Sequence, residues 1–176
     1  MKTKTYLPNE LDIRISGRTV ERENVLYLSH SAAYVEFELE GKYLAAVFAS
    51  EGGGADFQAW ITVYVNDMEV PYKKFPLEAG KKEYLLWENN TEEKAVVRVV
   101  KSSENQYAYA AICNFILDEG AKVTKTQAKE KHIQFIGDSI TSGFGNEGGA
   151  GDPFLTETEN PLRAYAALTA KKLDAE

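Results

Sequence analysis

The residues best suited to chemistry lie in the run HIQFIGDSITSGFG, residues 132–145. Three apolar side chains, Ile133, Phe135 and Ile136, precede the small-residue turn Gly137-Asp138-Ser139. A serine at the carboxyl end of a buried strand lies at the edge where open α/β sheets bind ligands. If a helix begins there, the backbone N–H of Ser139 lies at its N-terminus, where negative charge is stabilised. The pattern therefore predicts a nucleophile beside an oxyanion donor, as acyl transfer requires.

The turn resembles the first motif block of the SGNH, or GDSL-like, hydrolases. The run from Phe135 to Thr141, followed by Gly143 to Gly148 (GFGNEG) and Glu159 to Ala167 (ENPLRAYAA), is similar to carbohydrate esterase family two. The resemblance implies a small jelly-roll sandwich before an SGNH domain, and an acetylxylan esterase-like removal of acetyl groups from plant polysaccharides. It also implies that Ser139 is the nucleophile and that no metal or organic cofactor is needed.

A serine hydroxyl needs a base within hydrogen-bond reach, normally a histidine. In SGNH enzymes this base comes from a later Asp-x-x-His motif. The two histidines of the chain, His30 and His132, follow Tyr27 and Lys129 at that spacing, so neither has the motif. Along an extended strand of about 3.3 Å per residue, His132 would lie about 20 Å from Ser139. We therefore expect the base to lie outside this sequence and the chain alone to be inactive.

Other polar residues near the turn have simpler interpretations. Gly137 and Asp138 belong to the nucleophile turn, and Asp138 is interpreted as its cap rather than as a triad acid. Glu147 and Asp152 are interpreted as exposed loop acids, although either could border a sugar site. GFGNEG fits the dinucleotide fingerprint G-x-G-x-x-G, but GDSIT precedes it and GAGDP follows it, so no helix opens there.

Composition limits the classes of partner. The 176 residues are 44% hydrophobic, with a net charge of −7 and a sequence pI near 5.0. No basic patch favours a nucleic-acid partner, and a neutral carbohydrate substrate is compatible with this charge. The pairs Lys73-Lys74 and Lys81-Lys82 are interpreted as solvated turn charges. The single cysteine, Cys113, lies in an apolar run and is interpreted as a core thiol, and two distant histidines provide no metal site.

No targeting segment is visible. The amino terminus, MKTKTYLPNELDIR, lacks the apolar region of a signal peptide, and no apolar run reaches membrane-spanning length. We expect a cytoplasmic chain without a membrane partner, or a secreted one if a leader has been removed. Nothing in the sequence specifies an oligomeric state.

The first 120 residues have the pattern of short strands separated by turns. In residues 34–40 (YVEFELE), Val35, Phe37 and Leu39 alternate with glutamates, which predicts an antiparallel strand with one buried face. Gly41-Lys42 predicts a turn before a second strand over residues 43–50, and EGGGAD (residues 51–56) predicts a loop. Further strands are expected over residues 57–65, 83–87, 95–101 and 109–117.

We therefore expect a mainly β fold: a jelly-roll-like antiparallel β-sandwich over residues 1–120, a linker over 121–131, and the beginning of an SGNH hydrolase domain over 132–176. The sandwich class follows from the strand pattern, whereas the jelly-roll topology and the α/β/α, flavodoxin-like SGNH class are implied by the resemblance. Asn160 and Pro161 predict a helix start. One strand and one helix cannot bury a core, so residues 132–176 should be incomplete alone.

Two alternatives to the acetyl esterase remain open. Aromatic side chains on the sandwich could offer stacking faces to sugars and make it a non-catalytic carbohydrate-binding module; the candidates are Tyr43, Trp60, Tyr64, Tyr72 and Trp87. A lipase-like GDSL esterase would share the serine nucleophile but need an apolar acyl groove. In the leading hypothesis the partner is an acetylated oligo- or polysaccharide.

Overall fold

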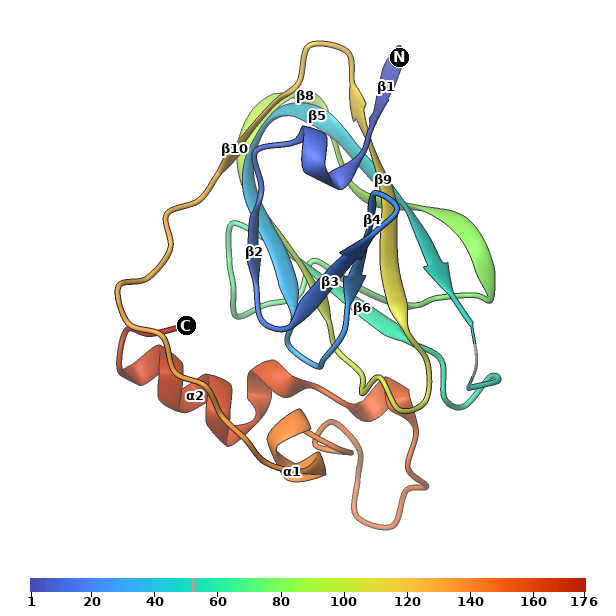
Figure 1. Ribbon diagram of the computed structural model, residues 1–176, viewed down its shortest axis with the longest axis vertical. Coiled ribbons are helices and arrows are strands. Elements are labelled where there is room, and N and C mark those ends of the chain that lie inside the picture. The colour runs from blue at the N-terminus through green and yellow to red at the C-terminus, as the bar shows by residue number, and fades with distance from the viewer. Residues whose placement is uncertain (52) are drawn as a thin grey trace.

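The computed structural model describes residues 1–51 and 53–176, and it is mainly β, as the sequence predicts (Figure 1). The strands are β1 (Thr3–Tyr6), β2 (Arg14–Ser16), β3 (Thr19–Arg22), β4 (Val25–Leu28), β5 (Tyr34–Ser50), β6 (Trp60–Val65), β7 (Lys73–Pro76), β8 (Gly80–Lys101), β9 (Ala110–Asp118) and β10 (Lys122–Lys125). The α-helices are α1 (Ser139–Ser142) and α2 (Tyr165–Lys172), and the 3₁₀ turns are η1 (Pro8–Glu10), η2 (Thr156–Thr158) and η3 (Pro161–Arg163).

All strands belong to one antiparallel sheet that curls over itself. Its main order is β3-β4-β9-β5-β8-β6-β7, while β1 pairs with β9, and β2 and β10 pair with β5. Strands β5 and β8 pair over nearly their whole lengths, from Tyr34 opposite Val100 to Ser50 opposite Gly80. Because both strands run through the bend, the two halves of the sheet face each other as the layers of a sandwich (Figure 1).

The bend lies at Gly41, where the sequence predicts a turn and the structure instead has a β-bulge within the continuous strand β5. The register with β8 shifts between Gly41 and Tyr43. The Asp118 carboxylate accepts hydrogen bonds from the backbone N–H groups of Lys42 and Tyr43, both at 3.0 Å. A Cβ at Gly41 would lie 2.9 Å from Asp118 Oδ1 and 3.0 Å from Ala121 Cβ. The sharp bend is therefore held by a carboxylate that leaves no room for a side chain.

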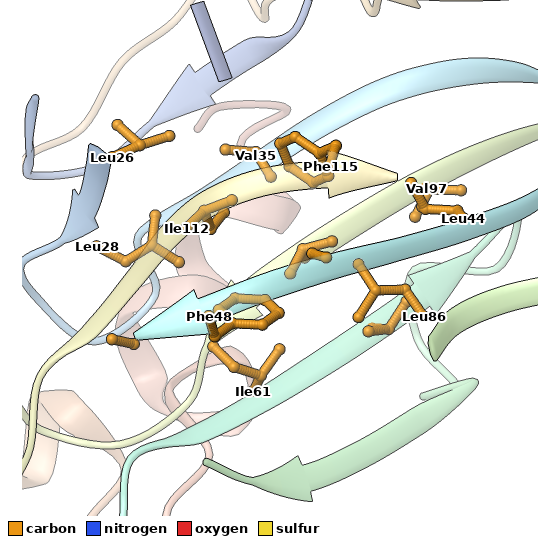
Figure 2. Packing of buried hydrophobic residues seen from close by; sticks show 14 of the residues in the cluster. Leu26, Leu28, Val35, Leu44, Phe48, Ile61, Leu86, Val97, Ile112 and Phe115 are labelled. Carbon is orange, nitrogen blue, oxygen red and sulfur yellow. The ribbon is translucent and has the colours of Figure 1, made fainter. Parts of the chain in front are cut away.

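The predicted alternation along β5 is confirmed on its inner face. Val35, Phe37 and Leu39 are fully buried, and Phe37 meets Phe115 of β9 edge-to-face with ring centroids 5.7 Å apart. Figure 2 shows the aliphatic and aromatic side chains of both layers meeting between the strands. This apolar interior is the main source of stability for the sandwich.

The outer face of β5 is less exposed than the alternation predicts, because Glu36 is buried. Its carboxylate accepts hydrogen bonds from Arg14 Nη2 at 2.6 Å and from Arg98 Nε and Thr126 Oγ1, both at 2.5 Å. Desolvation alone would raise the pKa of Glu36, but the Thr126 hydroxyl and the two guanidinium groups outweigh it and lower the pKa. The alternation predicts that this face is exposed to solvent. Pairing with two arginines allows the Glu36 carboxylate to be buried there.

The segment expected as a linker, residues 121–131, begins with a strand of the sandwich. Strand β10 pairs with β5, from Lys122 opposite Glu40 to Lys125 opposite Phe37. The sequence does not predict this strand, because its residues are mostly polar. Thr124 and the lysines lie on an exposed edge, where backbone pairing suffices and no apolar face is buried. The division of the chain into two units remains a prediction.

Residues 132–138 do not form the buried strand that the apolar run predicts. They are irregular, and Ile136 is 88% exposed. A parallel strand gains its hydrogen bonds only from neighbouring strands. Here a bridge between Lys131 and Ala175 and one bond from Ile133 N–H to the Glu176 carbonyl hold the start of the segment.

The carboxyl-terminal segment crosses one end of the sandwich (Figure 1). Its predicted helix is divided: Asn160 caps η3 by accepting from Leu162 N–H at 3.1 Å, and Ala164 is extended before α2 begins. Ala164 and Ala166 are buried, whereas Leu168 and Leu173 are about half exposed. In the part of the chain that the structure describes, no helix has the length and apolarity to cross a membrane.

Replacing Phe115 with alanine should destabilise the sandwich by about 3–5 kcal/mol, because the cavity would lie between fully buried side chains. Urea unfolding followed by circular dichroism measures this. Val20, which is 40% exposed on β3, is the matched control, and Val20→Ala should change the free energy of unfolding by no more than about 0.5 kcal/mol. Equal effects of the two substitutions would contradict this description of the core.

Candidate functional site

Ser139 is the first residue of the four-residue helix α1 and follows a sharp change of backbone direction. Asp138 is extended, with φ −110° and ψ −156°, and its carboxylate accepts a hydrogen bond from Ile140 N–H at 3.0 Å. The Asp138 carbonyl accepts from Thr141 and Ser142 N–H at 3.0 and 3.2 Å. Asp138 therefore caps its own turn, as interpreted from the sequence, and its carboxylate faces a backbone amide. Ser139 itself lies half-buried at the bend.

Two glycines shape this turn because neighbouring groups occupy the space of a side chain. A Cβ at Gly137 would lie 2.1 Å from Thr141 Oγ1, and that hydroxyl is 2.9 Å from Tyr165 Oη of α2. Gly143 ends α1 with φ +76°, and a Cβ there would lie 2.4 Å from the carbonyl oxygen of Asn160. The turn is thus packed against the segment that leads into α2, which limits its freedom to move.

Neither histidine hydrogen-bonds to Ser139 in the described chain. His132 lies 3.3 Å from Glu176, measured from Nδ1 to Oε1, and its side chain is 66% exposed. His30 lies exposed in the turn between β4 and β5. Among residues 1–51 and 53–176, Ser139 therefore has no histidine base in contact with it.

Lys74 of β7 holds the segment after α1 against the sandwich. Its ammonium donates to Glu147 Oε2 at 2.7 Å and to the carbonyls of Glu157 and Glu159 at 2.5 and 3.1 Å. The side chain is only 18% exposed. The interpretation of Lys74 as a solvated turn charge is therefore wrong, because three acceptors from a distant segment replace water around its three N–H groups.

Glu147 extends this contact towards the nucleophile turn; it lies in an exposed loop, as the sequence suggests, but its carboxylate is paired. Its Oε1 accepts from Asn160 Nδ2 at 2.7 Å, and the Asn160 backbone N–H donates to the Gly143 carbonyl at 3.2 Å. Desolvation would raise the pKa of Glu147, but hydrogen bonds from Lys74 and Asn160 outweigh it and lower the pKa. A continuous series of polar contacts thus joins β7 to the end of α1. Asp152, by contrast, only caps a local exposed turn at Gly149.

Glu159 is a buried acid that the sequence did not single out. It is fully buried; Oε2 accepts from Glu104 N–H at 2.8 Å, whereas Oε1 has no hydrogen-bond partner. Desolvation raises its pKa to about 7. Lys101, also fully buried, donates to the Ser103 carbonyl, and desolvation lowers its pKa to about 8. No local pattern distinguishes these residues from surface charges.

Aromatic side chains from the sandwich loops contact aromatic side chains of the segment after α1. Phe57 stacks on Tyr107 with centroids 5.1 Å apart, and Phe154 lies 5.6 Å from Tyr107 and 3.5 Å from Phe144. A separate hollow of about 310 Å³ lies where β6 and β7 meet the segment after α1, a contact region that we call the seam. Its lining is Trp60, Lys74, Glu147, Glu157 and Thr158. The segment that carries Ser139 therefore shares two contact regions with the sandwich.

Of the aromatic residues proposed for stacking, Tyr64 and Trp87 are buried, Tyr43 and Trp60 are half-buried, and Tyr72 is 52% exposed. Gly143 ends a helix rather than opening one, so GFGNEG has no dinucleotide-binding geometry. Among residues 1–51 and 53–176, no group of three or more His, Cys, Asp or Glu side chains is arranged to hold a metal ion.

Replacing Lys74 with methionine should loosen the segment from Gly143 to Asn160, because Glu147 would lose its cation and two carbonyls their donor. We expect a destabilisation of about 1–3 kcal/mol and faster amide hydrogen exchange in that segment. Lys82→Met, at a 53% exposed lysine, is the control and should change neither. Unchanged exchange in Lys74→Met would contradict a holding role.

Glu159 should make stability fall as the pH rises. Its pKa in the folded chain, about 7, exceeds that of an unfolded glutamate, so the carboxyl is compatible with burial at low pH and costs free energy once it ionises. Glu159→Gln should therefore be about 3 kcal/mol more stable than the wild type at pH 8, and equal to it only near pH 4, below the pKa at which the unfolded glutamate ionises. Urea unfolding at both pH values measures this, with exposed Glu157→Gln as control. A difference that does not change between the two pH values would contradict the assignment.

A family model described as "Carbohydrate esterase 2 N-terminal" matches residues 15–126. An "Acetylxylan esterase / glucomannan deacetylase" of Cellvibrio japonicus is 30% identical over 174 residues, which are 97% of this chain and 46% of that protein. The chain thus spans about half the length of the curated relatives that it matches along its whole length.

Solved structures agree with the fold. A family two carbohydrate esterase from Cellvibrio japonicus superposes with a TM-score of 0.89 at 24% identity, covering 99% of this chain and 51% of that one. A family two carbohydrate esterase from Clostridium thermocellum, in complex with cellohexaose, superposes with a TM-score of 0.82 at 26% identity, covering 93% and 49%. The family match covers more than half of the residues and includes strands β3 to β10. This chain therefore belongs to carbohydrate esterase family 2, with the family's N-terminal domain over residues 15–126.

Proposed function

We propose that the protein is an SGNH-type serine esterase that removes O-acetyl groups from carbohydrate, with Ser139 as its nucleophile. The observation that carries the proposal is the turn itself. Ser139 follows an extended residue, begins a helix and is half-exposed, while Asp138 and Gly143 fix the two ends of that helix. A nucleophile held by capping and packing loses little freedom on reaction, which favours catalysis.

In the proposed reaction the Ser139 hydroxyl attacks the acetyl carbonyl carbon while a base removes its proton. The C–O bond to the sugar breaks, the sugar oxygen takes up that proton, and the acetyl group remains on Ser139. Water then attacks the acetyl-serine, releases acetate and restores the hydroxyl. The Ser139 N–H is proposed as one donor to the carbonyl oxygen in both tetrahedral intermediates.

The base is proposed to come from beyond the contacts of this chain, since neither histidine bonds to Ser139. Loss of a triad base alone lowers kcat by several orders of magnitude, so the 176-residue chain is proposed to be inactive by itself. The exposed apolar side chains around the turn support this view, because a completed α/β layer would cover them; they are Ile136, Ile140, Tyr165, Leu168 and Leu173.

Acetylated polysaccharide is the proposed substrate class. The support comes from the relatives: two are named acetylxylan esterase / glucomannan deacetylase, and another was solved with cellohexaose. The seam is compatible with neutral sugars, because Lys74 and Glu147 neutralise each other there. The hollow beside Lys74 and Glu147 has a mainly polar lining and offers the lipase-like alternative no apolar acyl groove.

In the complete protein, Ser139→Ala should abolish release of acetate from acetylated xylan, lowering kcat by about 10⁴-fold or more. Ser142→Ala, in the same helix, is the control and should retain activity within about tenfold. A fluorophosphonate probe should label the wild type and not Ser139→Ala. Labelling of another serine with full activity in Ser139→Ala would refute the nucleophile.

The 176-residue chain should release acetate no faster than its own Ser139→Ala variant. Acetate release from p-nitrophenyl acetate and from acetylated xylan measures this. Turnover that depends on Ser139 in this chain would show that a base lies within it, and the proposal of an external histidine would then be wrong.

A further inference from the structure

The outer face of the sandwich has a hollow that takes no part in the Ser139 site. It has a volume of about 380 Å³, within the size range of small-molecule sites, and its lining is Arg22, Glu23, Val25, Tyr27, Ala49, Lys81, Tyr109 and Cys113. These residues come from or beside strands β3, β4, β9, β5 and β8, which are neighbours in the sheet. None belongs to residues 132–176. The hollow is therefore a property of the sandwich alone.

Small side chains and a bulge create this hollow. On β5, Phe48 points into the core and Ala49 lines the outer face, where it contributes only a methyl group. On β9 the register shifts so that Ile112 pairs with Phe48 and Asn114 with Val47, which leaves Cys113 as the extra residue. A bulge redirects its extra side chain. Cys113 is buried, as the sequence predicts, and its thiol also lines this hollow.

The wall of the hollow is aromatic and its rim carries both signs of charge. Tyr27 and Tyr109 lie with ring centroids 5.9 Å apart and planes inclined at 46°. Arg22 and Glu23 begin the tight β3–β4 hairpin, in which Glu23 and Asn24 have φ of +51° and +63°. Lys81 of β8 completes the rim. Two cations and one anion do not form a field of one sign, which argues against a strongly charged ligand.

We propose that this hollow is a non-catalytic binding site for a neutral oligosaccharide. A pyranose ring has an apolar C–H face and a rim of hydroxyls. The tyrosine wall suits the first, while the guanidinium, ammonium and carboxylate groups offer donors and an acceptor to the second. The choice of ligand rests on the proposed function, since an enzyme of acetylated polysaccharide gains from a second hold on the same chain.

Neither Tyr27 nor Tyr109 is among the aromatic residues that the sequence suggests for sugar stacking. Tyr27 lies in the short strand β4 (VLYL), where nothing in the local pattern distinguishes it from other aromatic residues of strands. Tyr109 precedes β9 in a loop. Only the pairing of β4 with β9, which aligns Tyr27 with Ala111, brings the two rings together.

The test is a titration of the 176-residue chain with xylohexaose, cellohexaose and mannohexaose, followed by isothermal calorimetry. At least one glycan should bind, and Tyr27→Ala and Tyr109→Ala should each weaken that binding about tenfold or more. Tyr27→Phe and Tyr109→Phe keep the ring and should bind within about threefold of the wild type. Tyr72→Ala, at an exposed tyrosine outside the hollow, is the matched control and should bind normally.

Cys113 provides a second readout because it is the only thiol of the chain. The bound glycan should slow its alkylation by iodoacetamide, and a non-binding sugar should not. Thermal unfolding of each variant shows whether it is folded. No binding by any of the three glycans, binding that Trp60→Ala abolishes while both tyrosine variants bind normally, or unprotected Cys113 under saturating glycan would each overturn the proposal. Binding needs no hydrolysis, so these outcomes are independent of whether Ser139 is a nucleophile.

Discussion

The backbone of the carboxyl-terminal segment forms few hydrogen bonds within the segment itself. The need to pair these backbone groups governs how the segment packs on the sandwich. Buried N–H and C=O groups must be paired, yet residues 132–164 contain little regular structure. The sandwich supplies the missing partners. Lys74 donates to two carbonyls of this segment, and the Asp56 carbonyl accepts from Thr156 N–H. In the other direction, the buried Glu159 carboxylate accepts from the backbone N–H of Glu104 in the sandwich. The turn that bears Ser139 is therefore positioned by a domain that precedes it in the sequence.

The sandwich can offer these contacts because its sheet is bent rather than divided. At Gly41 the Asp118 carboxylate holds the bulge of β5, and both long strands continue through the bend. One side of the curled sheet becomes the apolar core, and the other side faces three different surroundings. Around β6 and β7 it carries the seam with the carboxyl-terminal segment, and Glu36 lies among arginines on β5. Across β4 and β9 it carries the hollow between Tyr27 and Tyr109.

Glu36, Glu147 and Glu159 are all acids whose charge the surroundings must balance, but they are balanced differently. The pKa values of Glu36 and Glu147 are lowered, because cations and hydrogen-bond donors reach both carboxylates. The pKa of Glu159 is raised to about 7, because desolvation dominates and one oxygen has no partner. The seam thus combines the Lys74–Glu147 ion pair with Glu159, a buried group whose ionisation opposes its burial.

The sequence by itself determined the features that depend on near neighbours along the chain. The alternation in β5 predicted which face of the strand is buried, and Asn160 predicted a helix cap. The motif around Ser139 indicated the family. Partners far apart in the sequence decided the rest. Lys74, Glu147 and Glu159 have the pattern of surface charges until β7 meets residues 147–159. Residues 133–136 have the pattern of a strand, although no strand of the described chain pairs with them. Local patterns record steric and hydrophobic preferences, whereas burial, ion pairing and the hollow beside Cys113 depend on which segments the bent sheet brings together.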